Sequence, residues 1–153
     1  MSSMFLAGPF KSLVDPSTQA MSQRSIAAYT SIIDHFEKKG WHVHCAHRRE
    51  GWGREFMPPE TCTRIDFDEI SRCDVFVAYP GAPASPGTHI EIGWASALGK
   101  PIVLLLDPDA DYAFLVQGIG VVAAVERVFV RDNRPDTTDI EDAIGRLLTD
   151  SRS

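Results

Sequence analysis

Short apolar runs alternate with longer amphipathic segments along the chain. In the segment 22–39, apolar side chains recur at three- and four-residue spacing, which predicts a helix with one buried face, and Gly40 follows as a stop. The run at 74–78 is apolar enough to be buried on both faces, as strands of parallel sheets are. By the same reasoning we expect strands at 4–7, 41–46, 74–78, 102–106 and 126–130, and helices at 22–39, 58–72, 87–98, 112–118 and 138–148.

This alternation of strands and helices predicts a parallel sheet covered by helices on both faces. The fold class that follows is α/β, a Rossmann-like (flavodoxin-like) three-layer sandwich with a five-stranded parallel sheet. We interpret residues 1–153 as a single domain, which suits their number. In such sheets ligands bind beyond the carboxyl ends of the strands, where the strand order reverses. The loops after the first four strands are therefore the places to look for a site.

Composition and charge narrow the class of partner. The formal net charge is −6, so polymeric nucleic acid, which needs a basic surface, is not an expected partner. Three cysteines without a C-x-x-C spacing indicate reduced thiols in a cytoplasmic protein. No targeting segment precedes the first strand, and the apolar run at 101–106 is too short to span a membrane.

The segment 85–94 holds the richest set of chemical groups. Ser85 is a good helix N-cap and Pro86 suits the first helical position, so the amides of Gly87 and Thr88 would form an anion site. Glu91 follows one turn later and is the only acidic residue between positions 82 and 98. The positive end of the helix dipole would help to keep it ionised, as a nucleophile requires. The alternative is a glutamate on the exposed stripe of an amphipathic helix, and spacing alone does not separate the two.

Two further clusters carry polar groups. Asp66, Asp68 and Glu69 lie on one predicted helix, and a solvated helix face is the simpler interpretation for the last two. The segment 42–49 holds three histidines, one cysteine and the pair Arg48 and Arg49. We do not expect a metal there, because no second group of ligands stands at a suitable spacing. One of the two arginines, at the end of a strand, would meet a phosphate, unless both form surface ion pairs with nearby glutamates.

Phe10 and Lys11 follow the first strand. An aromatic ring at that position can stack on a nucleobase, as aromatic residues do in base-binding sites. The alternative is a core phenylalanine followed by a solvated lysine.

Together these residues resemble the nucleoside 2-deoxyribosyltransferase superfamily. The markers are Phe-Leu-Ala-Gly-Pro at 5–9, Asp66 with Asp-Val-Phe-Val-Ala at 74–78, Gly-Thr-His-Ile-Glu-Ile-Gly at 87–93 and Gly-Lys-Pro at 99–101. The resemblance implies that Glu91 attacks the anomeric carbon and that Asp66 assists near the sugar and base. The transferases usually carry an acidic or amide side chain six residues before the nucleophile, where this chain has Ser85. Serine there is similar to the 5'-monophosphate N-glycosidases, in which it helps to bind phosphate.

Within the superfamily, the chain most resembles the CMP and hydroxymethyl-CMP hydrolases of peptidyl-nucleoside antibiotic pathways. The segments that carry this likeness are 5–16, 46–50, 83–96 and 111–116. The resemblance implies a cytidine nucleotide as substrate and a homodimer in which the loop bearing Tyr112 completes the partner's pocket. We place the base and ribose near Gly8, Phe10, Lys11, His47 and Tyr112, and the phosphate near Ser85, Gly87, Thr88 and Arg48.

The expected reaction is therefore hydrolysis of CMP to cytosine and ribose 5-phosphate through a covalent intermediate on Glu91. We expect it to need neither a metal nor an organic cofactor. Two alternatives remain: a transferase that moves the pentosyl unit to another base, and a nucleotide-binding module without turnover.

Overall fold

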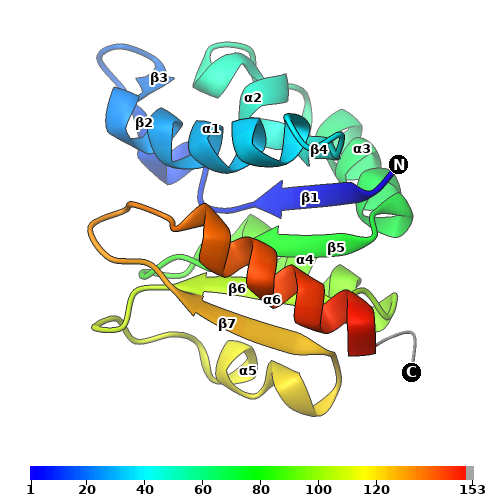
Figure 1. Cartoon of the computed structure of the whole chain (residues 1–153). Coiled ribbons are helices and arrows are strands. Elements are labelled where there is room, and N and C mark those ends of the chain that lie inside the picture. Colours follow the sequence, from blue (N-terminus) through cyan, green and yellow to red (C-terminus); the bar gives the residue numbers. More distant parts are fainter. Residues whose placement is uncertain (151–153) are drawn as a thin grey trace.

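Five parallel strands form the central sheet, in the spatial order β4-β1-β5-β6-β7 (Figure 1). The structure is a computed structural model, and it describes residues 1–150. Strand β1 lies at the point where the chain changes direction across the sheet: Leu6 pairs with Cys45 on one side and with Val77 on the other. The strands are β1 (Ser3–Ala7), β4 (His42–Cys45), β5 (Val75–Ala78), β6 (Ile102–Leu106) and β7 (Val125–Phe129).

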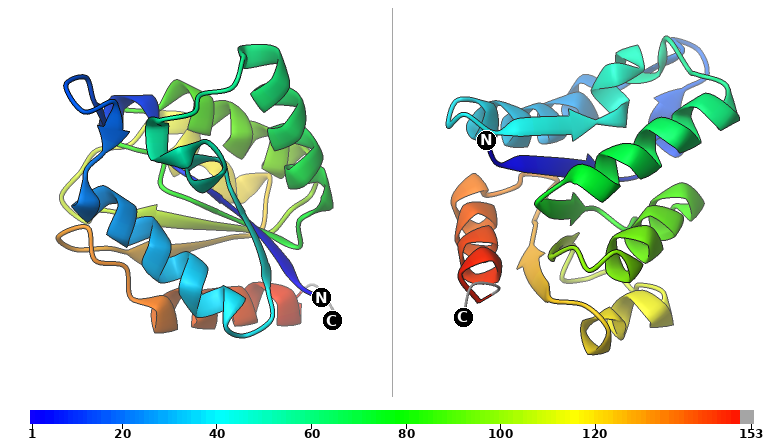
Figure 2. Two further views of the ribbon diagram at one scale, coloured as in Figure 1. Left: turned by 90° about the horizontal axis from the view of Figure 1, so that it is seen from above. Right: turned by 90° about the vertical axis from the view of Figure 1, so that its right-hand side faces the viewer.

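Helices cover both faces of this sheet. Figure 2 shows α1 (Gln23–Glu37) and α6 (Thr137–Asp150) on one face, and α3 (Pro59–Arg72) and α4 (Pro86–Ala97) on the other. The short helix α5 (Phe114–Gln117) packs on the second face through Val116. The expected five-stranded, three-layer α/β fold is therefore confirmed.

Alternation along the strands explains the two halves of the core. In β1, Met4 and Leu6 pack toward α1 and α6, whereas Phe5 and Ala7 pack toward α3 and α4. All five residues of β6 are buried, because side chains on both faces of a central parallel strand meet helices. The ends of the strands are thereby held rigidly, which is what a site at their carboxyl edge requires.

Several short elements do not follow from the periodicity of the sequence. Strand β4 ends at Cys45, and the next four residues form a helical turn, α2 (Ala46–Arg49), so His47 lies on a helical turn where the sequence predicts a loop. A small antiparallel pair precedes α1. The remaining short elements are β2 (Val14–Asp15), β3 (Ala20–Met21), η1 (Lys11–Leu13), η2 (Gly51–Gly53) and η3 (Ile119–Val121).

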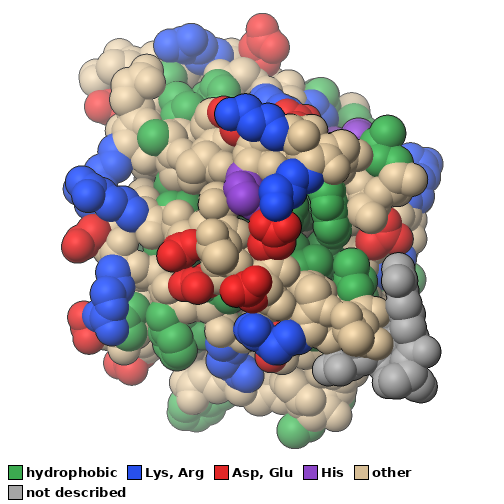
Figure 3. All heavy atoms as spheres, viewed as in Figure 1, with side chains coloured by type: hydrophobic (Ala, Val, Ile, Leu, Met, Phe, Trp, Pro, Cys, Tyr) green, Lys and Arg blue, Asp and Glu red, His purple; other side chains and the backbone are tan. Residues whose placement is uncertain are grey.

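Acidic and basic side chains are interspersed over the face formed by α1 and α6 (Figure 3). Glu141 of α6, for example, accepts hydrogen bonds from Lys39 at 2.7 Å and from His35 at 2.9 Å. This face therefore offers no continuous basic surface to a nucleic acid. Among residues 1–150, no helix combines the length and apolar character needed to cross a lipid bilayer. All three cysteines are free thiols, as their spacing predicts.

Candidate active site

The loops after β1 and β5 face each other at the carboxyl edge of the sheet. Strand order reverses between these two neighbours, because the chain leaves β1 for β4 on one side and later enters β5 on the other. Residues 8–10 follow β1, and residues 79–85 lead from β5 into α4. This is the place where open parallel sheets bind their ligands.

The start of α4 has the cap that the sequence predicts. Ser85 is the N-cap, and its hydroxyl accepts hydrogen bonds from the Thr88 backbone N–H at 3.5 Å and from the Thr88 hydroxyl at 2.9 Å. Pro86 occupies the first turn, and Gly87 is exposed with open space around its α-carbon. The exposed Gly87 leaves the helix N-terminus accessible to an anion, although Thr88 itself is buried.

Glu91 and Asp66 meet across the interface of α4 and α3. Burial is the main cause that raises the pKa of Glu91 well above its ordinary value. The negative charge of Asp66 and a hydrogen bond between the two carboxyl groups raise this pKa further, whereas Arg49 lowers it. The helix dipole, which we expect to favour the ionised form of Glu91, is therefore opposed in the free protein by desolvation and by a neighbouring carboxylate. Burial and the Asp66 carboxylate thus favour the protonated form of Glu91.

The two arginines after β4 have different partners, and neither contacts Ser85. Arg48 forms a bidentate ion pair with Glu37 at the end of α1, at 2.8 and 3.0 Å, and donates to the carbonyl of Val43. These partners draw Arg48 back toward the amino end of β4, so its contact with a phosphate stays a prediction, beside the surface ion pair that the sequence also allowed. Arg49 instead donates to Asp66 at 2.7 Å and to Glu50 at 2.9 Å.

His47 is a buried, neutral histidine that shapes the loop after β1. Its Nε2–H donates to the carbonyl of Pro9 at 2.9 Å, and its Nδ1 accepts from the Cys45 thiol at 3.4 Å. Burial is the main cause that lowers the pKa of His47 to about 4. The ring is stacked between those of Phe10 and Tyr29, at centroid distances of 4.5 and 4.3 Å. His47 therefore positions the loop, and with 2% of its surface exposed it offers a substrate little contact.

Gly8 is required by close packing. An α-carbon substituent there would lie 2.1 Å from the hydroxyl of Tyr29, which is buried and donates to the carbonyl of Pro9. A larger residue would push apart β1 and α1 directly beside the site.

The aromatic side chain of Phe10 is part of a wall that includes a residue the sequence analysis missed. Phe56 lies 5.0 Å from Phe10, centroid to centroid, and is 43% exposed. The ammonium group of Lys11 lies 5.5 Å from the centre of the Phe56 ring. Phe56 stands in an irregular loop after η2, where no periodic pattern marks it. An exposed aromatic beside Phe10 and Lys11 suits stacking on a base.

Tyr112 lines a cavity of about 230 Å³ in its own chain, together with Pro9, Tyr79, Gly81 and Asp107. Its hydroxyl accepts a hydrogen bond from the Asp107 backbone N–H at 2.7 Å. Neither Glu91 nor Asp66 lines this cavity, so the carboxyl pair lies outside it.

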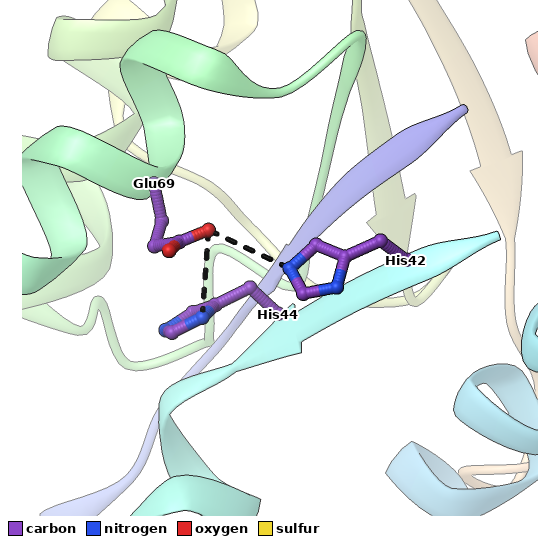
Figure 4. A group of neighbouring side chains, drawn as sticks. All are labelled: His42, His44 and Glu69. Carbon is purple, nitrogen blue, oxygen red and sulfur yellow. Dashed lines mark ion pairs between the residues drawn. The ribbon is translucent and has the colours of Figure 1, made fainter. Parts of the chain in front are cut away.

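Figure 4 shows His42 and His44 of β4 close to Glu69 of α3, and His44 also contacts Arg49. His42 Nε2 and His44 Nδ1 each lie 3.7 Å from the same oxygen of Glu69, a residue expected on a solvated helix face. A metal would require a free lone pair on Nδ1 of His44. Arg49, however, donates to Nε2 of His44 at 2.8 Å, which leaves the proton of the neutral ring on Nδ1. The group is therefore better suited to hydrogen bonding than to holding a metal.

Comparisons with known proteins place the chain in a family. The sequence profile of the family described as nucleoside 2-deoxyribosyltransferase matches residues 5–133. BlsM, whose solution structure is known, is 50% identical in sequence to this chain. The alignment covers 99% of this chain and 94% of BlsM, and the two structures superpose with a TM-score of 0.85. The CMP N-glycosidase BcmB from Clostridium botulinum is 34% identical, with 92% and 98% covered and a TM-score of 0.69.

A conserved protein from Enterococcus faecalis, 18% identical with a TM-score of 0.67 over 96% of this chain and 99% of its own, shows the same fold. The search of curated proteins gave no match. Because the profile spans most of the sequence and BlsM and BcmB are each more than 30% identical, the chain belongs to the nucleoside 2-deoxyribosyltransferase family, whose members are enzymes acting on nucleosides.

Proposed function

We propose that this protein is an N-glycosidase that hydrolyses a cytidine 5'-monophosphate, either CMP or 5-hydroxymethyl-CMP. The observation that carries the proposal is the Glu91–Asp66 carboxyl pair, one helical turn beyond the Ser85-capped start of α4. A nucleophile and a proton carrier thereby stand beside an anion site. The likeness to a CMP N-glycosidase supports the choice of substrate.

The 5'-phosphate would bind at the start of α4. The exposed amide of Gly87 and the hydroxyl of Ser85 can donate to phosphate oxygens, and the helix dipole favours the negative charge. The buried Thr88 hydroxyl, which donates to Ser85, would orient the Ser85 hydroxyl toward the phosphate. A carboxylate at position 85 would repel the same dianion. The side chain at this position therefore favours a nucleotide over an unphosphorylated nucleoside.

The reaction follows from the shared proton. Glu91 passes its proton to Asp66, and its carboxylate attacks C1' while the bond from C1' to the base breaks and the base leaves with the electron pair. Asp66 delivers the proton toward the departing base. Water then hydrolyses the glycosyl ester, releases ribose 5-phosphate and returns a proton to the carboxyl pair.

A second copy of the chain is the partner that we propose. Large apolar side chains are exposed on α4, on α5, which directly follows the loop of Tyr112, and at the ends of α4 and η3: they are Ile90, Leu98, Phe114, Leu115, Val121 and Val122. Exposed apolar surface of this kind marks interfaces. In such a homodimer the Tyr112 loop would reach the partner's site.

The test is chromatography of CMP, dCMP, 5-hydroxymethyl-CMP, UMP and cytidine after incubation with the protein. We expect free base from CMP or its hydroxymethyl derivative and none from cytidine. Glu91→Ala should abolish the release, whereas Asp68→Ala, on the exposed side of α3, should retain it. If none of the five compounds loses its base, the proposal fails and a binding module without turnover takes its place.

Transfer of the pentosyl unit is the second candidate, because the matching family is described as a transferase. Adding a second free base to the same incubation separates the two reactions. A new nucleotide would indicate transfer, whereas ribose 5-phosphate formed in equal amount to the base would indicate hydrolysis.

A further inference from the structure

Arg49 stands where three parts of the site meet. One of its terminal nitrogens donates both to Asp66 at 2.7 Å and to Nε2 of His44 at 2.8 Å. The other donates to Glu50 at 2.9 Å. The side chain is only 15% exposed, and so is held between α3, β4 and its own helical turn. A planar guanidinium can satisfy several acceptors at fixed angles in this way, which a lysine cannot.

We infer that Arg49 is a positioning residue, which aims Asp66 at Glu91 and supplies the positive charge beside the carboxyl pair. This inference rests on the proposed function. In this role Arg49 does not contact the substrate. It acts through Asp66, to which it donates a hydrogen bond.

The charges around the carboxyl pair explain why a cation is needed there. Glu91 is faced by Asp66 from α3 and by Arg49 from α2, and the Tyr29 hydroxyl and Cys45 thiol lie near enough to interact with it. Burial raises the pKa of both the hydroxyl and the thiol, so neither supplies a charge at neutral pH. Arg49 is therefore the one positive group among those that act on the pKa of Glu91.

The guanidinium of Arg49 is also linked to the pair of aromatic side chains formed by Phe10 and Phe56. Glu50, only 4% exposed, binds Arg49 through one oxygen and accepts from the Met57 backbone N–H at 2.9 Å through the other. Met57 directly follows Phe56, which packs against Phe10. Through these contacts Arg49 links Asp66 to the loop that carries Phe56, and so fixes their relative positions.

Direct binding of phosphate by Arg49 is the competing interpretation. Both terminal nitrogens already donate to protein groups, and the remaining Nε–H is buried without a hydrogen-bond partner among residues 1–150. A phosphate at either terminal nitrogen would compete there with Asp66 or Glu50, and the side chain is only 15% exposed to an incoming ligand. The contacts therefore favour positioning over binding.

The first experiment compares Arg49→Met and Arg49→Lys with Arg64→Met, whose side chain is exposed on α3. We expect Arg49→Met to lower kcat about 100-fold while KM changes by less than about threefold, because misplacing a reacting group affects the chemical step. Arg49→Lys should recover part of this loss, and Arg64→Met should behave as wild type. A rise in KM with kcat unchanged would show a phosphate contact instead and overturn the inference.

A second measurement does not depend on turnover. The carboxyl carbon of Glu91 is followed by NMR against pH in the wild type and in Arg49→Met, and Glu91→Gln identifies its signal. Without the positive charge, we expect Glu91 to titrate at higher pH. An unchanged titration in a folded variant would overturn the inference even if the protein hydrolyses CMP. If no nucleotide is hydrolysed but the titration moves, the proposed function fails and the electrostatic role of Arg49 stands.

Discussion

Glu91 is half-buried and its carboxyl group is partly desolvated beside Asp66, an arrangement that serves reactivity at the expense of stability. Its pKa in the folded chain is above that in the unfolded chain, so this group favours folding most below the unfolded pKa. Its contribution to stability is lost as the pH rises toward the folded pKa. We therefore expect Glu91→Gln, which needs no proton, to raise the free energy of unfolding by about 1–2 kcal/mol at pH 8.

Urea unfolding at pH 8 and pH 4 measures this effect. The gain should be present at pH 8 and absent at pH 4, where the wild-type carboxyl is protonated in both states. An equal difference at both values would point to packing and not to the proton.

His47 gives the opposite dependence on pH. Burial lowers its pKa in the folded chain to about 4, so the unfolded chain binds a proton that the folded chain excludes. Between pH 6.5 and 4 the wild type should lose about 3 kcal/mol of stability through this residue alone. Denaturant unfolding of His47→Gln should show a correspondingly smaller loss over the same range. Parallel curves for the two proteins would mean that the buried ring takes up its proton without cost.

Some individual residues are predictable from sequence and others are not, for physical reasons. The cap at Ser85 follows from local chemistry, because serine is favoured at the N-cap and the proline that follows is favoured at the first helical position. Arg48 and Arg49 are adjacent and chemically identical, so only the direction of the α2 turn decides which one reaches Glu37 and which reaches Asp66. Phe56 was missed because a loop has no periodicity to reveal it.

At the scale of the element, α4 combines a helix cap and an anion site in one side chain. Ser85→Asp separates the two functions, because aspartate caps helices as well as serine does but repels a phosphate. We expect the melting temperature to change little and kcat/KM for CMP to fall at least about 10-fold, a loss of about 1.4 kcal/mol in transition-state binding.

The control for this variant is Ser85→Ala, which removes the cap as well as the hydroxyl. It should cost about 1 kcal/mol of stability. If Ser85→Asp retains full activity on CMP, the phosphate does not bind at this helix start.

The parallel strands and the long helices were predictable because the pattern of apolar and polar residues in each is long enough to be recognised. All five parallel strands follow from short apolar runs bounded by breakers, and the four long helices follow from their apolar stripes. The pair β2 and β3 and the turn α2 have two to four residues each, too few for a period to show. Their shape is set by tertiary contacts such as that of His47 with Pro9.

At the scale of the whole molecule, the exposed apolar residues on α4, α5 and η3 lack a partner within the described chain. If a second copy covers them, Leu115→Glu should place a charge in the interface. Sedimentation equilibrium should then show a dimer for the wild type and a monomer for the variant. A wild type that is already monomeric at micromolar concentration would remove the proposed partner.

The position of Tyr112 decides whether such a dimer is also needed for catalysis. In this structure the Tyr112 hydroxyl accepts a hydrogen bond from the Asp107 backbone N–H of its own chain. The alternative to the proposed role is therefore that Tyr112 serves the site of its own chain. We expect Glu91→Ala to be inactive, Tyr112→Ala to be weakly active, and their mixture to recover activity. One site of each mixed dimer would combine an intact Glu91 with the partner's intact Tyr112, which gives up to about a quarter of wild-type activity after random exchange of subunits. No recovery in a sample shown to contain mixed dimers would mean that Tyr112 acts on the Glu91 of its own chain.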